Sequence, residues 1–153
     1  MATIAGTTFV FEQPRVARYV ALEQTAGGFT LPTPTSSDRH FEQIEFPGVI
    51  ESPSAIFFRT RHTGRPRFSV RINSASLTQF QFTDDDPPER CWHEIIPARV
   101  ADGSTLRPRD NELTFFAADG VVTFGDVVIL YTSSELTIKI PIVIGPAVVG
   151  NLG

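Results

Sequence analysis

A segment near the C-terminus constrains the fold of this chain most strongly. From Leu136 to Ile144, leucine or isoleucine occupies every second position. Successive side chains of a β-strand point to opposite faces of a sheet, so one face of this segment is uniformly apolar. Such a face needs a cover of other apolar side chains. The segment therefore predicts a strand of a β-rich protein with a buried sheet face.

Short alternating runs between turn residues continue through the chain. The 12 prolines and 11 glycines interrupt it at short intervals, and no helical spacing of apolar residues is sustained. The expected strands are Thr7–Glu12, Val16–Gln24, Phe41–Phe46, Ala55–His62, Arg67–Asn73, Leu77–Phe82, Cys91–Pro97, Glu112–Ala117, Val121–Tyr131 and Leu136–Ile144. This pattern favours an all-β fold, a two-sheet antiparallel β-sandwich with jelly-roll topology.

The connections between these strands are predicted from turn residues. Ala26–Ser37 is expected to be a long loop, and His62–Pro66 and Asp119–Gly120 are expected to turn the chain back on itself. Gly125–Asp126 indicates a bulge or corner inside a strand. Within the strand Arg67–Asn73, alternation predicts that phenylalanine, valine and isoleucine face inward while arginine and serine face outward.

Length and composition indicate one domain. A chain of 153 residues is near the usual size of a single domain, so we expect residues 1–153 to form one β-sandwich. The 41% hydrophobic content is sufficient for a core, and 13 phenylalanines supply much of its bulk. The small residues of Pro146–Gly153 predict a tail that is flexible or docks on a neighbour.

Charge and cysteine content limit the partners and the compartment. The net charge of −4 gives no general attraction for nucleic acid. Cys91 is the single cysteine, so no intrachain disulfide forms, and it is expected to be a small buried residue. The N-terminus lacks the basic and apolar regions of a signal peptide, and no apolar run is long enough to span a membrane. The expected location is the cytoplasm, with release by a route that needs no signal peptide as the alternative.

Several passages resemble one superfamily of β-sandwiches. They are Phe68–Asn73 followed by Leu77, Trp92–Pro97, Leu106–Phe115 and Val121–Tyr131. From residue 55 to residue 131, the chain resembles the second half of a galactose-binding-domain-like jelly roll, a superfamily that includes many carbohydrate-binding modules. The resemblance implies a β-sandwich that binds carbohydrate. Ligand residues in this superfamily lie on variable loops or on one sheet face, so the resemblance assigns none here.

An arginine cluster is the main candidate for a binding site. Arg59, Arg61, Arg65, Arg67 and Arg71 fall close together in the sequence. If their two strands are antiparallel neighbours, the guanidinium groups form one basic patch that could hold phosphate, sulfate or an anionic glycan through bidentate bonds. The competing interpretation is a solvated outer face that acidic neighbours partly neutralise.

Two further features have both a functional and a structural interpretation. Asp84, Asp85 and Asp86 offer hard oxygen ligands that suit Ca²⁺, but their spacing is not that of an EF-hand, and a solvated loop or one paired with the arginines is the alternative. Trp92 is a candidate for stacking on a sugar ring, although a single tryptophan in a sandwich strand is more often part of the core. Tyr19 and Tyr131 are the other aromatic candidates.

No catalytic signature is present. The chain has no Gly-x-Ser-x-Gly elbow, no glycine-rich phosphate loop and no histidines at metal-ligand spacing, so we expect neither an enzyme nor a cofactor. The preferred function is a non-catalytic, lectin-like module that binds glycan. The alternative is a structural subunit of an oligomeric particle, phage-like or tail-like, that contacts protein neighbours through its final strand and tail.

Overall fold

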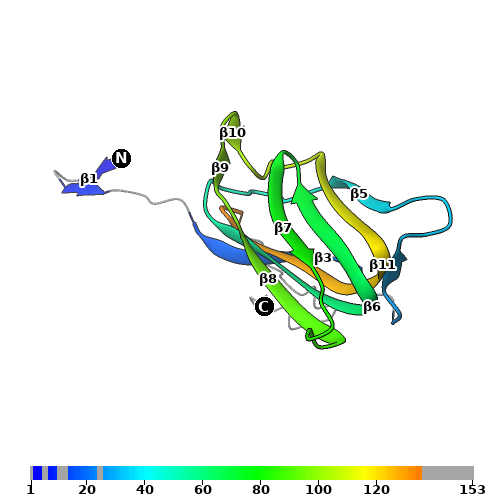
Figure 1. Ribbon diagram of the computed structural model, residues 1–153. Helices are drawn as coiled ribbons and strands as arrows, with labels where there is room; N and C mark the ends of the chain where they lie inside the picture. The colour runs from blue at the N-terminus through cyan, green and yellow to red at the C-terminus, as the bar shows by residue number, and fades with distance from the viewer. Residues whose placement is uncertain (1, 5–6, 10–13, 24–25, 136–153) are drawn as a thin grey trace, which may run out of the picture.

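The computed structural model describes residues 2–4, 7–9, 14–23 and 26–135 (Figure 1). All regular secondary structure in these residues is β-strand. The strands are β1 (Ala2–Ile4), β2 (Thr7–Phe9), β3 (Val16–Glu23), β4 (Phe29–Leu31), β5 (Asp38–Ile44), β6 (Ser54–Ile72), β7 (Ala75–Gln81), β8 (Glu89–Ile96), β9 (Arg99–Val100), β10 (Gly103–Ser104) and β11 (Asn111–Ser133). The all-β, antiparallel fold class is confirmed.

Two long strands, β6 and β11, organise the fold. They pair with each other along most of their length, from Leu113 opposite Ile72 to Leu130 opposite Ala55. β7 and β8 pair with β6, and β3, β4 and β5 pair with β11. Every other strand of the main sheet is thus attached to one of these two.

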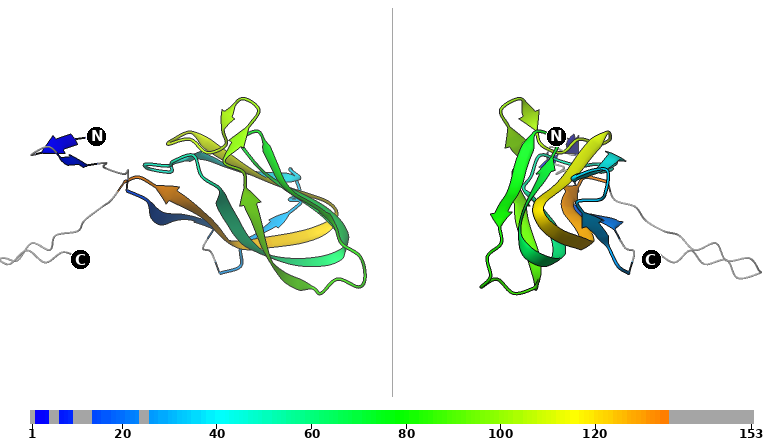
Figure 2. Two further views of the ribbon diagram at one scale, coloured as in Figure 1. Left: turned by 90° about the vertical axis from the view of Figure 1, so that its left-hand side faces the viewer. Right: turned by 45° about the vertical axis from the view of Figure 1, so that its right-hand side comes forward.

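Both long strands bend sharply. Phe58 and Phe68 lie ten positions apart in β6, which is about 33 Å in a straight strand, yet their ring centroids are 6.0 Å apart. In β11, the ring centroids of Phe115 and Phe124 are 4.9 Å apart. Each strand must therefore fold back across the core, and Figure 2 shows both curving at one end of the molecule.

The bends divide the sheet into two layers that face each other. The first layer contains β8, residues 54–62 of β6, residues 121–133 of β11, β3 and β4. The second layer contains β7, residues 66–72 of β6, residues 111–118 of β11, and β5. This is the two-sheet sandwich that the alternation predicts, with strands that cross from one layer to the other.

The bend is made by residues that tolerate unusual backbone angles. Gly64, Asp119 and Gly120 have φ of 76°, 63° and 147°. The register between β6 and β11 shifts between Ala118 and Gly120. A Cβ on Gly120 would lie 3.0 Å from the Cβ of Pro66, so a larger residue here would require Pro66 to shift by a few tenths of an ångström.

Two of the predicted turns take a different form. His62–Pro66 and Asp119–Gly120 do redirect the chain, but as bends inside the continuous strands β6 and β11, so neither connects two separate strands. Turn residues in the sequence mark a change of direction, but they do not distinguish a hairpin from a corner between layers. The bulge at Gly125–Asp126 is confirmed, since the register shifts between Gly125 and Val128 and Asp126 has a φ of 51°.

Other sequence predictions concern the loop of residues 26–37, the buried face of Arg67–Asn73 and the C-terminal segment. The predicted long loop of residues 26–37 contains the short strand β4, which pairs with Val122–Phe124 of β11. Phe68, Val70 and Ile72 are buried, as predicted, and Arg67 and Arg71 are exposed. Leu136–Ile144 and Pro146–Gly153 lie outside the described residues, so their predicted strand and tail stay predictions.

The core between the layers is rich in aromatic rings. Phe58, at 2% exposure, stacks against Trp92 and meets Phe68 and Phe115 edge to face. Burial of each such ring stabilises the fold by about 1.5–3 kcal/mol. The phenylalanines that make the sequence bulky therefore hold the two layers together.

Candidate functional site

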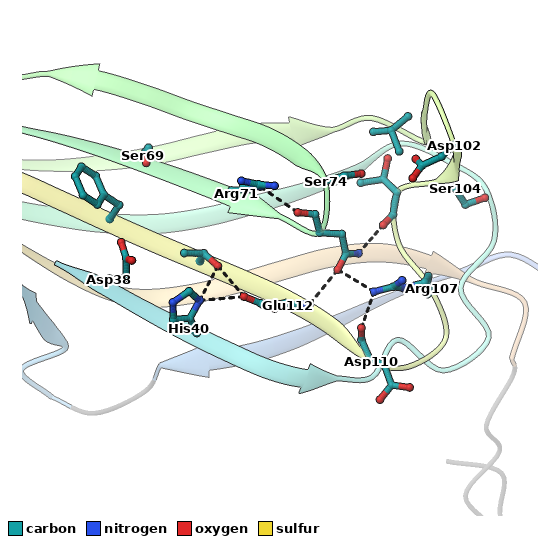
Figure 3. Close-up of a pocket in the computed structure, with 15 residues that line it drawn as sticks. Asp38, His40, Ser69, Arg71, Ser74, Asp102, Ser104, Arg107, Asp110 and Glu112 are labelled. Carbon is teal, nitrogen blue, oxygen red and sulfur yellow. Dashed lines mark hydrogen bonds and ion pairs between the residues drawn. The ribbon is translucent and has the colours of Figure 1, made fainter. Parts of the chain in front are cut away.

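A polar groove lies on the outer face of the second layer (Figure 3). Its volume is about 770 Å³. β5, residues 111–118 of β11 and residues 66–72 of β6 form its floor, and the segment 100–110 forms one wall. The residues that line it are Asp38, His40, Ser69, Arg71, Asn73, Ser74, Val100, Asp102, Ser104, Thr105, Arg107, Asp110, Glu112, Thr114 and Phe116.

Strand alternation places the floor residues. In β11, Leu113, Phe115 and Ala117 point into the core, so the residues between them point outward. His40 of β5 lies opposite Thr114 in the register. Its Nδ1 is 3.0 Å from Glu112 Oε1 and 3.1 Å from Thr114 Oγ1, and both side chains of the His40–Glu112 pair are about half exposed, at 45% and 50%. Three polar groups are thus fixed against one another on the floor.

A pair of asparagines fixes the end of the groove. Asn111 is fully buried, and its amide nitrogen donates to the carbonyls of Ile44 at 2.9 Å and Arg107 at 2.7 Å. Its amide oxygen accepts from Asn73 Nδ2 at 2.9 Å and from the backbone N–H of Arg107 at 3.0 Å. Asn73 Nδ2 also donates to the carbonyl of Thr105 at 2.6 Å. This network ties the wall segment to the sheet, so the groove is formed before any ligand binds.

The two arginines of the groove are oriented by backbone carbonyls. Arg71 Nε donates to the carbonyl of Asn73 at 3.2 Å, and an Nη of Arg107 donates to the carbonyl of Asp110 at 2.7 Å. Each guanidinium has further N–H groups beyond these bonds. Arg71 and Arg107 are therefore held in place with donors left for a ligand.

The groove also carries carboxylates that make no ion pair or side-chain hydrogen bond within the described part of the chain. They belong to Asp38, Asp102 and Asp110, which are all exposed. A carboxylate has about four acceptor sites. With Glu112, the groove holds four carboxylates against two guanidinium groups, so its charge is negative.

The groove continues over the same sheet face toward β7. A second hollow of about 440 Å³ shares Ser69 and Phe116 with it and extends past Gln79 and Gln81. Phe116 is half-buried, and the guanidinium of Arg67 lies 5.5 Å from its ring centroid. An aromatic surface thus lies in the middle of a polar strip.

The predicted arginine patch does not form as one surface. Its two segments are halves of the single strand β6 and lie in different layers, so they are not antiparallel neighbours. Arg59 and Arg61 line a separate hollow of about 320 Å³, Arg67 lies near Phe116, and Arg71 lines the groove. The bend at Gly64 separates the two halves of β6 and therefore the arginines that they carry.

Acidic side chains pair with three of these arginines. Arg59 bonds Asp126 at 3.2 Å and Arg67 bonds Asp119 at 2.9 Å. Arg65 forms a two-point ion pair with Asp84, whose hydrogen bond from Arg65 lowers the pKa of that carboxyl. The interpretation of a solvated, partly neutralised face accounts for this arrangement.

The acidic loop is held by the protein itself. Asp84 pairs with Arg65, and Asp86 accepts hydrogen bonds from the backbone and hydroxyl of Thr83. Asp85 is exposed. Among the described residues, no group of three His, Cys, Asp or Glu side chains is arranged to hold a metal ion.

The aromatic candidates and the cysteine have different surroundings. Trp92 is 7% exposed, and its indole N–H donates to Thr60 Oγ1 at 2.8 Å, so it belongs to the core and has no face for a sugar. Tyr131 is buried as well, and its hydroxyl donates to the carbonyl of Pro47 at 3.2 Å. Tyr19 is 71% exposed on the first layer. Cys91 was expected to be buried, but it lies on the outward side of β8 and is exposed.

Of the residues that line the groove, only Arg71 was a candidate binding residue in the sequence. The others are ordinary outward-facing positions of β5 and β11, and their proximity depends on strand pairings that no local pattern reveals. A signal was nevertheless present. The passages Phe68–Asn73 and Leu106–Phe115, which carry the superfamily resemblance, meet through Asn73 and Asn111 at the end of the groove.

The fold and this groove define the class of protein: an antiparallel β-sandwich with an open polar surface on one layer. No family model matches the chain, and a search of curated proteins found no match. The structure is similar to part of dimeric latent PorU from Porphyromonas gingivalis, with a TM-score of 0.59 and 11% identity. The match covers 78% of this chain and 13% of PorU, so this chain spans a small part of that protein. At this identity the likeness shows the fold alone.

A second similar structure is the C-terminal CBM6 of LamC, a marine laminarinase from Zobellia galactanivorans. The TM-score is 0.45 at 9% identity, and the match covers 74% of this chain and 99% of that one. Separately, the described residues contain no helix of the length and apolar character needed to cross a membrane.

Proposed function

We propose that this protein is a non-catalytic binding module and that its ligand is a carbohydrate bound in the groove of the second layer. The observation that supports this most directly is the chemistry of the groove. Its volume of about 770 Å³ is within the range of small-ligand sites. Such sites are usually lined mainly by apolar side chains, whereas polar side chains dominate this one, which suits a strongly polar ligand.

The groove offers what a polyol requires. Each sugar hydroxyl both donates and accepts hydrogen bonds. The carboxylates of Asp38, Asp102 and Asp110 are acceptors, and the guanidinium groups of Arg71 and Arg107 are donors. Because both guanidinium groups are already held by backbone carbonyls, a ligand would lose little affinity to ordering them.

The charge of the groove favours a neutral sugar. Carboxylates outnumber guanidinium groups among its lining residues, so uronic acid or sulfate groups would meet repulsion. Phe116 adds an aromatic surface against which the apolar face of a pyranose ring can pack. The anionic ligands considered for the arginine cluster therefore suit this groove less well than neutral glycans do.

The exposure of the carboxylates supports binding without catalysis. A general acid needs a carboxyl that keeps its proton, which requires an apolar, buried environment. Asp38, Asp102, Asp110 and Glu112 are all exposed, and Glu112 already contacts His40 and Thr114. These side chains are arranged as acceptors for hydroxyl groups.

A glycan array followed by calorimetry tests the proposal. On the array, the full chain should bind neutral oligosaccharides. In calorimetry, Asp38→Asn should bind the same oligosaccharide about 10- to 100-fold more weakly than wild type, because a hydrogen bond to a charged group contributes roughly 1.5–3 kcal/mol. Asp85→Asn is the matched control, since Asp85 is an exposed carboxylate on a loop that does not line the groove. The proposal would be contradicted if the protein bound no glycan on the array, or if Asp38→Asn and wild type bound the oligosaccharide with equal affinity.

A further inference from the structure

The outer face of the first layer is apolar over several adjacent strands. Its largest members are Tyr19 at 71% exposure, Ile95 at 64%, Phe57 at 42% and Leu130 at 40%. Smaller apolar residues lie between them. We define the apolar face as Tyr19, Ala21, Ala55, Phe57, Ile95, Val128 and Leu130.

The strand register aligns these residues in two rows. One row crosses β8, β6, β11 and β3 and contains Ile95, Ala55, Leu130 and Tyr19 in that order. The next row contains His93, Phe57, Val128 and Ala21. The residues are therefore direct cross-strand neighbours, and the surface is continuous.

Among the described residues, this face exposes a large apolar area. An aromatic side chain presents about 150–250 Å², so Tyr19 and Phe57 alone expose roughly 200 Å². With Ile95 and Leu130 the apolar face reaches the few hundred Å² above which contiguous apolar patches mark interaction surfaces. It can supply the centre of a dimer interface, which typically buries about 800 Å² on each partner.

We propose that the apolar face binds a second copy of this chain. The two copies pack face to face about a two-fold axis that runs parallel to the strands, between β6 and β11. The backbones of β6 and β11 are already paired on both sides in this layer, so the contact needs only side chains. This is the geometry in which two sheets stack to form a core.

Side-chain size supports a second copy as the occupant. The proposed axis reverses the strand order, so β6 of one copy lies over β11 of the other. In the first row, Ala55 then faces Leu130 of the second copy, and Ile95 faces Tyr19. In the second row, Phe57 faces Val128 and His93 faces Ala21. Each row contains one pair of a small and a large residue, Ala55 with Leu130 and Ala21 with His93. The other two pairs, Ile95 with Tyr19 and Phe57 with Val128, bury apolar surface against apolar surface, so the face is complementary to itself.

Charge complementarity supports the same arrangement. Beyond the apolar rows, Arg59 of β6 lies beside Asp126 of β11, with 3.2 Å between Nη1 and Oδ2. The same axis places Arg59 of one copy over Asp126 of the other. Each guanidinium would therefore meet an opposite charge across the interface, at the end of the apolar contact.

The dimer would have a consequence for binding, and this consequence rests on the proposed function. The grooves lie on the second layers, which are the outer surfaces of such a dimer. Two grooves would then face in opposite directions and bridge two glycan chains rather than bind one chain twice.

Sedimentation equilibrium of the full chain over a range of concentrations tests the contact directly. We expect a monomer–dimer equilibrium whose dissociation constant rises at least tenfold in both Tyr19→Glu and Leu130→Glu. Val121→Glu is the matched control, because Val121 has the same 40% exposure as Leu130 and lies at the bend, away from the apolar face. Circular dichroism confirms that each variant is folded. A monomer at every concentration, or a dimer unaffected by Tyr19→Glu, would overturn the proposal whether or not the protein binds glycan.

A size exchange tests the orientation of the two copies. Ala55→Leu should weaken the dimer because two large residues would then face each other, and the double variant with Leu130→Ala should restore it toward wild type. A dimer that Ile140→Glu dissociates but Leu130→Glu leaves intact would assign the contact to the C-terminal segment and would overturn the proposal.

Discussion

Single side chains decide the geometry of the groove, and Asn111 is the clearest case. Its amide makes two donor and two acceptor bonds, which is its full capacity, while it is completely buried. In the sequence it is one polar residue at the start of an alternating strand. Its turn position was predictable, but the partners at Ile44 and Asn73 come from distant parts of the chain.

Loss of this amide should be costly. Asn111→Ala leaves the carbonyls of Ile44 and Arg107 without their side-chain donor. It also removes the acceptor of the Arg107 backbone N–H and one of the two acceptors of Asn73 Nδ2. We expect a loss of about 3 kcal/mol or more in the free energy of unfolding, measured with urea, because each unsatisfied buried group costs roughly 1–3 kcal/mol. Gln79→Ala, which removes an exposed amide, should change stability by less than about 0.5 kcal/mol. Equal effects in the two variants would show that the network does not hold the wall.

Tyr131 couples stability to alkaline pH. Burial raises the pKa of its hydroxyl, so the folded state keeps this proton at a pH where the unfolded chain loses it. Its contribution is complete below the unfolded pKa of about 10 and is lost as pH rises through the higher folded value. Wild type should therefore lose stability more steeply than Tyr131→Phe above about pH 10.

At neutral pH, Tyr131→Phe should cost only about 0.5–1 kcal/mol, because Ser133 Oγ still donates to the carbonyl of Pro47 at 2.8 Å. Urea titrations of both proteins from pH 8 to pH 11 measure how steeply the free energy of unfolding falls with pH. An equal fall in both proteins would show that Tyr131 does not cause the alkaline loss of stability.

At the scale of elements, the sequence predicts strands well and their continuity poorly. The alternation in Arg67–Asn73 and in Val121–Tyr131 comes from burial on one face, which is a local property. Whether Gly64 ends a strand or bends it depends on what the opposite strand does. Here Gly120 of β11 lies opposite Gly64 of β6, so both strands turn the same corner together.

Substitution at this corner should separate backbone strain from steric contact. Gly64→Ala places a Cβ in open space at φ of 76° and should cost about 1–2 kcal/mol. Gly120→Ala adds contacts of 3.0–3.1 Å with Pro66 to its own unfavourable φ of 147°, so its cost should be larger, about 2 kcal/mol or more. Thermal and urea unfolding of both variants measure the difference. A smaller loss in Gly120→Ala would show that the corner is more adaptable than the close packing indicates.

At the scale of the whole molecule, the fold places the two proposed binding surfaces on opposite layers. The groove lies on the outer face of one layer and the apolar face on the outer face of the other. The sequence predicts the all-β fold class, which the structure confirms. The predicted arginine cluster is divided by the bend: Arg59 and Arg61, Arg67, and Arg71 line three different hollows, and Arg65 pairs with Asp84. Only the pairing of β5 with β11 brings Asp38 and His40 to the groove, and this pairing has no local signature.

The central claim is that a neutral glycan binds on the second layer. Nuclear magnetic resonance of the labelled full chain, titrated with an oligosaccharide that the array identifies, tests it most directly. We predict that the shifted signals cluster at His40, Asn73, Arg107 and Thr114, with little change at Arg59, Arg61 or the loop Asp84–Asp86. Shifts that cluster around Arg59 and Arg61 instead, or no shifts with any neutral oligosaccharide, would contradict the account.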